Sequence, residues 1–465
     1  MRIAFAAAEV APFMKVGGLA DVAGSLPQAL AAAGHEVTVY MPLHLGIDRA
    51  KHGIPEDGEL RSVAYGRARA RVSYPSIQSD GVRTVFVRSD KRIGRDKAYG
   101  YPDDNKRYAF WCRAVAEHIA AGPAPDVVHA HDWHAGLLMQ LICDDAPTVF
   151  TIHNLAYQGK TSIDVMDVIG LRRTRLIAEQ RGELNPMARG IINADVVSTV
   201  SERYAQEILT PEFGEGLQDL LRERKRDLFG IVNGIDTRLF DPATDRHIAA
   251  TYSASDPSPK AANKAALQKE AGLAVDPKAP LVGMVGRLVE QKGIDILTAA
   301  APGIFAAGAQ MVVLGAGDAS YEEKWKRFAR EHKGRLHLVL GFDAALAQRI
   351  YAGTDMFVMP SRFEPCGLGQ LISFRYGTVP VVHSVGGLRD TVRDADAERG
   401  NGFSFEPYTA DALLETVKRA IRAYRDAPRW DALRARGMRE DHSWGASAKK
   451  YEQLYATAKT RHKKH

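Results

Sequence analysis

The sequence predicts an α/β protein with two doubly wound halves, each containing a mostly parallel sheet with helices on both faces. Three observations support this prediction. Short apolar runs alternate with longer stretches of helical periodicity. The alternation stops in a polar, proline-containing stretch at 241–259 and then begins again. Glycine and charged residues follow several of the apolar runs in both halves.

The first half contains seven expected strands, each a short apolar run bounded by turn residues. They lie at residues 3–8, 36–41, 84–88, 126–130, 148–153, 196–200 and 230–233. Helical periodicity lies between them at residues 26–33, 108–121, 136–143 and 203–209. The first run follows only one basic residue, Arg2, and ends at Glu9. We therefore interpret it as a buried strand rather than a signal peptide.

The second half repeats this arrangement. Strands are expected at residues 281–285, 311–314, 336–340, 356–359 and 379–383. Helices are expected at residues 294–307, 321–330, 344–351 and 369–376. The predicted domains are therefore residues 1–240 and 241–440, followed by a basic helical tail at 441–465. The final run, 461–465, is interpreted as a solvated terminus.

Composition excludes several classes of protein. The chain has 465 residues, of which 45% are hydrophobic and 25% charged, as in an ordinary globular protein of two or three domains. Its net charge of +6 favours a local anion site over a nucleic-acid-binding surface. The apolar runs are shorter than the ~20 residues of a membrane helix, so no membrane partner is expected. The three cysteines have no metal-type spacing, which favours a reducing, cytoplasmic location.

The first candidate site is the segment from Lys15 to Val22, which lies between the first strand and the following helix. Gly17 and Gly18 allow the backbone to approach an anion closely, and the helix N-terminus supplies unpaired N–H groups. Lys15 adds a positive charge. The alternative is a plain structural turn, because glycine is common at such positions.

The second candidate is the segment 286–293, which occupies the same position in the second half. Arg287 and Lys292 can both point into one crevice and bind phosphate oxygens. Taken singly, either residue could equally be solvated surface charge.

The third candidate is the segment 360–369. Glu364 is expected just before a helix, where the helix dipole would stabilise its charge and it could bind ligand hydroxyls. The alternative is a capping carboxylate without chemistry. Cys366 could be a reactive thiol or a small packing residue.

Further polar and glycine residues follow other strands. His129 and His131 alternate along a strand and could share a face, but no further ligand completes a zinc set, so no metal is expected. Ligands of open α/β sheets bind outside the carboxyl ends of the strands. The crevice between the two halves is therefore the expected site.

Seven segments together resemble those of bacterial glycogen synthases and plant starch synthases in order and spacing. They are residues 15–22, 131–134, 151–154, 233–236, 286–293, 361–368 and 386–388. The resemblance runs from residue 1 to about residue 440. It implies a GT-B fold, with two facing Rossmann-like domains, a deep interdomain cleft and a C-terminal helix returning to the first domain.

The resemblance also implies a reaction. Glucose would pass from ADP-glucose to the non-reducing-end 4-hydroxyl of an α-1,4-glucan, such as glycogen or a maltooligosaccharide, with retention and release of ADP. No cofactor or metal is implied. The sequence leaves open whether retention uses a carboxylate nucleophile or front-face attack.

Residue roles follow from the same resemblance. Arg287 and Lys292 correspond to the pair that neutralises the diphosphate leaving group, and Lys15 to a further contribution to that anion. Glu364 corresponds to the residue that holds the glucose hydroxyls, and His153 to the histidine beside the reacting sugar. The implied substrate-binding residues are Gly17, Gly18, Asp21, Asp132, Asn154, Asn233, Phe342, Cys366, Gly367, Leu368, Gly386 and Gly387.

The sequence departs from the family pattern at several positions. Gly369 stands where bacterial members commonly have threonine, and Ile372 where an aromatic residue is frequent. Phe342 follows Gly341 where the family usually has tyrosine, and is either a stacking surface for adenine or a core residue. The segment 103–108 does not clearly reproduce the Asp-Asn pair of the family.

Three other functions remain as alternatives. A catalytically weak or inactive glucan-binding protein of the same fold would be supported by Gly369 and Ile372. A glycosyl hydrolase would need a paired acid and nucleophile, and a glucan phosphorylase would need a Schiff-base lysine in a longer chain. The sequence does not determine oligomeric state, regulation, acceptor length or the preference for ADP-glucose over UDP-glucose.

Overall fold

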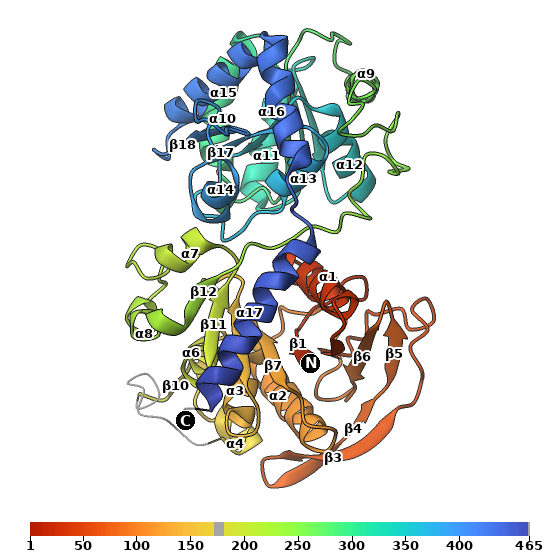
Figure 1. Ribbon diagram of the computed structural model, residues 1–465, viewed down its shortest axis with the longest axis vertical. Helices are drawn as coiled ribbons and strands as arrows, with labels where there is room; N and C mark the ends of the chain where they lie inside the picture. The colour runs from red at the N-terminus through yellow and green to blue at the C-terminus, as the bar shows by residue number, and fades with distance from the viewer. Residues whose placement is uncertain (172–180, 464–465) are drawn as a thin grey trace. The chain divides into compact units, whose positions relative to one another are not determined.

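The computed structural model describes residues 1–171 and 181–463, which form two compact units (Figure 1). The first unit contains Met1–Gly234 and, from the other end of the chain, Trp444–His465, of which the last two residues lie outside the described ranges. The second unit contains Ile235–Ser443. The junction expected near residue 240 thus lies between Gly234 and Ile235.

The first unit is built on an eight-stranded sheet. Its order is β12 (Leu228–Gly230), β11 (Val196–Thr199), β8 (Thr148–Ile152), β7 (Val127–His131), β1 (Arg2–Ala6), β2 (Glu36–Pro42), β6 (Val82–Val87) and β5 (Ser76–Ser79). All neighbours are parallel except β5, which pairs antiparallel with β6. Every residue of β7 and β8 is buried, as expected for strands with helices on both faces.

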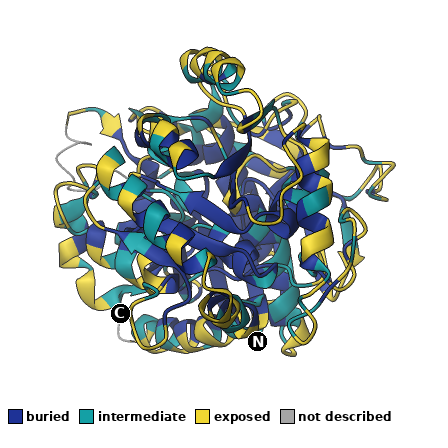
Figure 2. Ribbon diagram, turned by 90° about the horizontal axis from the view of Figure 1, so that it is seen from above, coloured by how far each residue is buried: buried dark blue, intermediate teal, exposed yellow. Residues whose placement is uncertain are grey.

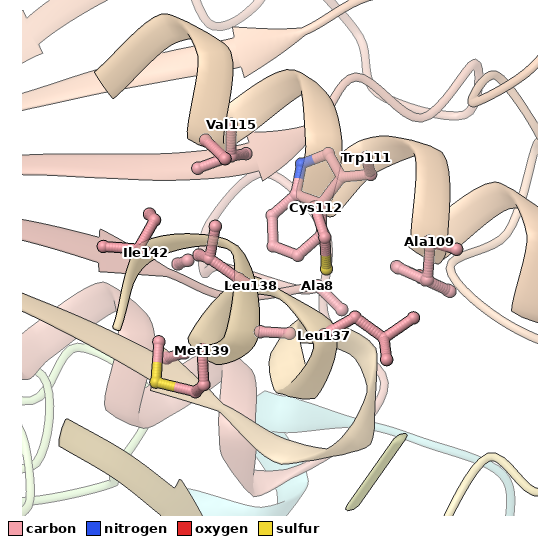
Figure 3. Packing of buried hydrophobic residues seen from close by; sticks show 14 of the residues in the cluster. Ala8, Ala109, Trp111, Cys112, Val115, Leu137, Leu138, Met139 and Ile142 are labelled. Carbon is pink, nitrogen blue, oxygen red and sulfur yellow. The ribbon is translucent and has the colours of Figure 1, made fainter. Parts of the chain in front are cut away.

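Helices cover both faces of this sheet. They are α1 (Gly18–Ala32), α2 (Asp104–Ala120), α3 (Asp132–Ile142), α4 (Val165–Ile169), α6 (Pro186–Asn193), α7 (Glu202–Glu207), α8 (Gln218–Glu223) and α17 (Trp444–His462), with a 3₁₀ turn at Lys225–Asp227. Figure 3 shows one part of the core, where Trp111 and Cys112 of α2 pack near Leu137 and Leu138 of α3. Two antiparallel pairs complete the unit: β3 (Glu59–Tyr65) with β4 (Ala68–Tyr74), and β9 (Thr161–Ser162) with β10 (Glu183–Leu184).

The C-terminal helix α17 packs on the first unit, which confirms the predicted return of the chain. Trp444, Tyr451 and Tyr455 are buried in the same apolar cluster as residues of β1 and α1. The hydroxyl of Ser447 donates to the carbonyl of Val232 at 2.8 Å. This contact accompanies the departure of the chain from the sheet, so the strand ends at Gly230 and the predicted strand 230–233 is wrong.

The second unit is built on six parallel strands. Their order is β15 (Leu336–Leu340), β14 (Gln310–Gly315), β13 (Leu281–Val285), β16 (Met356–Met359), β17 (Val379–His383) and β18 (Phe403–Phe405). Numbered along the chain, this order is 3-2-1-4-5-6, the Rossmann arrangement. The bounds of β13, β15, β16 and β17 are those predicted from the sequence.

Helices also surround the second sheet. They are α9 (Lys260–Glu270), α10 (Ile294–Ala306), α11 (Ala319–Glu331), α12 (Ala344–Gly353), α13 (Gly369–Arg375), α14 (Gly386–Thr391), α15 (Ala410–Tyr424) and α16 (Ala427–Arg439), with a 3₁₀ turn at Glu290–Lys292. In Figure 2 the central strands are buried, and the exposed residues lie mainly on helices and loops. Within the described ranges, no helix is long and apolar enough to cross a membrane.

Each sheet reverses its strand order at one point. In the first unit the chain moves outward from β1 to β2 on one side and to β7 on the other, and in the second unit from β13 to β14 and to β16. A crevice forms outside the carboxyl ends of the strands at such a reversal. Residues that follow β1, β7, β8, β13 and β16 therefore lie where a ligand site would form.

Candidate active site

The first group lies between β1 and α1 and is held by a buried carboxylate. Glu9 is 3% exposed, and its Oε2 accepts hydrogen bonds from the backbone N–H groups of Val16 and Gly17, the latter at 3.0 Å. Burial raises the pKa of Glu9, although these hydrogen bonds oppose the increase. Glu9 therefore fixes the position of the glycine-containing loop.

This loop leaves an open, cationic helix N-terminus. The predicted helix at 26–33 in fact begins at Gly18, and a Cβ atom built there would meet nothing within 4 Å. Lys15 Nζ lies 2.6 Å from Asp21 Oδ1, one turn into α1. Glu9 already binds two of the loop N–H groups, so the first N–H groups of α1 and Lys15 remain for an anion.

The second group contains histidines at the ends of β7 and β8. His129 and His131 share one face of β7, as predicted, with ring centroids 4.0 Å apart. The Nδ1 atom of His131 lies 2.9 Å from Nε2 of His153, which directly follows β8. Burial lowers the pKa of all three histidines, that of His153 to about 3, so the rings are neutral. Among the residues that the structure describes, no group of three His, Cys, Asp or Glu side chains is arranged to bind a metal.

Asp132 lies beside these histidines, as the first residue of α3. Its φ angle is +56°, and its Oδ1 accepts a hydrogen bond from the backbone N–H of His153 at 2.7 Å. Burial raises the pKa of Asp132 to about 7, although hydrogen bonds from the N–H groups of His153 and Asn154 oppose the increase. Asp132 can therefore gain or lose a proton near neutral pH, as an acid or base in catalysis does.

Asn233 lies apart from these groups, after the edge strand β12. It is buried, and its Oδ1 has no hydrogen-bond partner among the described residues. An unpaired buried carbonyl oxygen is costly unless a further group binds it. Asn233 thus remains a candidate binding residue, but no contact among the described residues of the first unit joins it to Asp132 or His153.

The third group lies in the second unit, after β13 and β16. Lys292 Nζ and Glu364 Oε2 are 2.6 Å apart, and the hydroxyl of Ser361 donates to the same oxygen at 3.0 Å. The side chain of Glu364 is only 8% exposed, whereas that of Lys292 is 21% exposed. The exposed Arg287 donates to the side-chain oxygen of Gln291 at 2.9 Å.

This geometry corrects the expected environment of Glu364. The helix α13 begins at Gly369, as predicted, but Glu364 lies more than one helical turn before it, too far for the helix terminus to stabilise its charge. Lys292 and Ser361, rather than a helix terminus, therefore hold the carboxylate.

Glycines allow the Glu364 loop to pack closely against α14. Gly386 has a φ of +44°, and a Cβ there would lie 2.0 Å from the carbonyl oxygen of Glu364. A Cβ on Gly387 would lie 2.1 Å from the carbonyl oxygen of Cys366. Both positions therefore require glycine. Cys366 itself is buried, as a packing residue would be, and it is followed by the half-buried Gly367 and Leu368.

Three positions that depart from the family pattern, Phe342, Gly369 and Ile372, differ in their surroundings. Phe342 is 83% exposed, so the alternative that it is a core residue is wrong. A Cβ on Gly369 would lie 2.9 Å from Cε1 of Phe357 and 3.2 Å from Sδ of Met359. The space of a larger side chain at position 369 is thus already occupied. Ile372 is buried.

Apart from Asn233 and Phe342, the structure therefore brings the predicted residues together in three groups. Two lie in the first unit and one in the second, all at carboxyl ends of parallel strands. Sequence reasoning missed Glu9, Ser361 and the contact between His131 and His153. Only Glu9 gave a signal, since an ionisable residue directly after a buried strand needs partners.

Comparisons with known proteins agree with this arrangement. The family model described as "Starch synthase catalytic domain" matches residues 2–223, and "Glycosyl transferases group 1" matches residues 267–433. The chain is 47% identical to a glycogen synthase of Anaeromyxobacter dehalogenans, over 98% of this chain and 99% of the relative. It is 43% identical to a glycogen synthase of Geotalea daltonii, over 98% of both chains.

Solved structures give the same result. The chain is similar to the catalytic domain of starch synthase IV from Arabidopsis thaliana, bound to ADP and acarbose, with a TM-score of 0.89 and 33% identity over 99% of both chains. A sucrose-phosphate synthase from Thermosynechococcus elongatus, 19% identical with a TM-score of 0.64 over 98% of both chains, shares the fold. These findings confirm the resemblance noted in the sequence.

Proposed function

Because the chain belongs to the glycogen and starch synthase family of GT-B glycosyltransferases, we propose that it transfers glucose from ADP-glucose to an α-1,4-glucan. The acceptor is the 4-hydroxyl at the non-reducing end, the anomeric configuration is retained, and ADP leaves. The named relatives and the starch synthase bound to ADP and acarbose support this donor and this class of acceptor.

The observation that carries the proposal is the contact between Lys292 and Glu364 after β13 and β16. Negative charge accumulates on the diphosphate as the glucosyl–oxygen bond breaks. Lys292 and the exposed Arg287 are fixed cations that stabilise this charge more strongly in the transition state than in the ground state. In the first unit, Lys15 at the open N-terminus of α1 can also bind an anion.

Glu364 acts on the sugar rather than as a nucleophile. Its Oε2 is already engaged by Lys292 and by the hydroxyl of Ser361. A carboxylate neutralised in this way is a weak nucleophile, but its other oxygen can accept hydrogen bonds from sugar hydroxyls. In the first unit, the neutral ring of His153 and the carboxyl of Asp132 bind the reacting sugar and the acceptor.

The test is a glucose-transfer assay on glycogen primer, with ADP-glucose and UDP-glucose in parallel. We expect incorporation from ADP-glucose. Lys292→Met and Glu364→Gln should each lower kcat by roughly 10²–10³-fold, the effect of removing one such electrostatic group. Both variants should remain folded, as thermal melting curves check, although Lys292→Met removes a partner of the buried carboxylate and should lower the melting temperature. Lys326→Met removes an exposed lysine of the same unit, paired with Glu323, and should leave kcat unchanged.

Each alternative function predicts a different result. Glucan binding without incorporation from either donor would favour a glucan-binding protein. Release of reducing sugar from glycogen without a nucleotide donor would favour a hydrolase. Near-normal turnover by Glu364→Gln would contradict the role given to that carboxylate.

A further inference from the structure

His131 is a buried residue to which neither the sequence nor the comparisons assign a role. It is the last residue of β7, is 0% exposed, and lies directly before Asp132. One ring nitrogen, Nδ1, lies 2.9 Å from Nε2 of His153. The other, Nε2, has no hydrogen-bond partner among the described residues.

The proton between the two rings can lie on either side. If His153 carried it on Nε2, His131 would accept at Nδ1 and, as a neutral ring, would carry its own proton on Nε2. That N–H would be buried without an acceptor, which costs about 1–3 kcal/mol. If His131 instead carries the proton on Nδ1, only a lone pair on its Nε2 lacks a partner.

The neighbouring aromatic rings do not provide an acceptor for a proton on Nε2 of His131. Phe5 and His129 lie with centroids 4.1 Å and 4.0 Å from that of His131, at interplanar angles of 32° and 40°. An N–H bond in the plane of His131 is therefore not directed at the face of either neighbour. A second hydrogen bond also fixes the position of His153, because its backbone N–H donates to Asp132.

We propose that His131 is a positioning residue for His153: its Nδ1–H donates to Nε2 of His153 and holds that ring in the Nδ1–H tautomer. His153 then presents Nδ1–H as a hydrogen-bond donor, since its hydrogen bonds to described residues are made through Nε2 and the backbone N–H. An N–H donor in a fixed position can bind a hydroxyl oxygen of the sugar. Because its position is already fixed, the donor does not have to reorient as the bond to the leaving group breaks. That identity of the bound group rests on the proposed function, whereas the tautomer does not.

The tautomer can be measured directly in the ligand-free protein. In histidine-selective ¹⁵N labelling, two-bond couplings from the ring protons distinguish Nδ1–H from Nε2–H, and His153→Ala assigns the signal. We expect Nδ1–H for His153 in the unaltered chain. His131→Phe keeps a ring but removes the donor, so His153 should lose its single tautomer. His118→Phe changes another buried histidine of this unit, bonded to Tyr40, and should leave His153 unchanged.

Kinetics provide a second, independent readout. His131→Phe should lower kcat for glucose transfer about tenfold, the value of one lost hydrogen bond. In a His153→Ala background it should have no further effect, because His131 acts only through His153. Additive effects would show a merely structural role and overturn the proposal, as would an Nε2–H tautomer of His153 in the unaltered chain. If no glucose transfer is found, the tautomer measurement still decides the inference and only the proposed function fails.

Discussion

Replacing Asp132 with asparagine should stabilise the protein at neutral pH while impairing its reaction. The substitution removes one ionisable group and changes little else. Asparagine tolerates the φ of +56° at this position and keeps the oxygen that accepts the N–H of His153 at 2.7 Å. Any pH-dependent change in stability therefore reports the charge.

The magnitude follows from the pKa of Asp132, which burial raises from 3.8 to about 7 in the folded protein. Because the folded-state pKa is the higher one, the protonated carboxyl contributes its full stability below pH 4. As the pH rises, the unfolded chain ionises first, and this contribution is lost up to about pH 7. The loss is roughly 2 kcal/mol at pH 5 and roughly 4 kcal/mol at pH 8.

Hydrogen exchange of the amides in β7 and β8, followed from pH 5 to pH 8, measures the stability of the first unit separately. At each pH, the free energy of unfolding of Asp132→Asn should exceed that of the unaltered protein by the values above. Asp126→Asn is the matched control, because Lys459 at 2.8 Å lowers the pKa of Asp126, so removal of its charge should slightly destabilise. A difference for Asp132→Asn that does not vary with pH, or a variant that is less stable at pH 8, would refute the reasoning.

Three further predictions concern other contacts. Glu9→Leu removes the oxygen that accepts both backbone hydrogen bonds, so amides of the glycine-containing loop should exchange faster and KM for ADP-glucose should rise; unchanged exchange would contradict this. Gly369→Thr should cost about 1–3 kcal/mol in urea unfolding through overpacking against Phe357, and Phe357→Leu should relieve it; an unchanged midpoint would argue otherwise. Tyr455→Phe removes the 2.9 Å hydrogen bond to His129 and should cost about 1–3 kcal/mol, measured by the same unfolding; no loss would mean that the bond contributes little.

The sequence predicted the buried strands of the second unit best. The strands 281–285 and 356–359 are apolar runs bounded by turn residues, so burial and strand length both point to the same bounds. The helix α15 was missed although its signals are present: Thr409 caps it, and Leu413 and Val417 lie on one buried face. The hairpin β3–β4 was also missed, although arginine alternates with apolar residues along β4.

The site was predicted as a set of residues but not as a set of contacts. Lys292 and Glu364 lie far apart in the chain, and their 2.6 Å contact depends on β13 pairing with β16. The order of strands in a sheet is a tertiary property that local periodicity does not encode. The contact between His131 and His153 likewise follows from the pairing of β7 with β8.

The two-segment construction of the first unit has a consequence for synthesis. The helix α17 supplies buried Trp444, Tyr451 and Tyr455, yet it follows the whole of Ile235–Ser443 in the chain. At about 5–20 residues per second, a ribosome needs on the order of 10–40 seconds to make that intervening stretch. Throughout that interval the nascent first unit exposes the apolar surface that α17 later covers, and it can complete its core only after α17 has been synthesised.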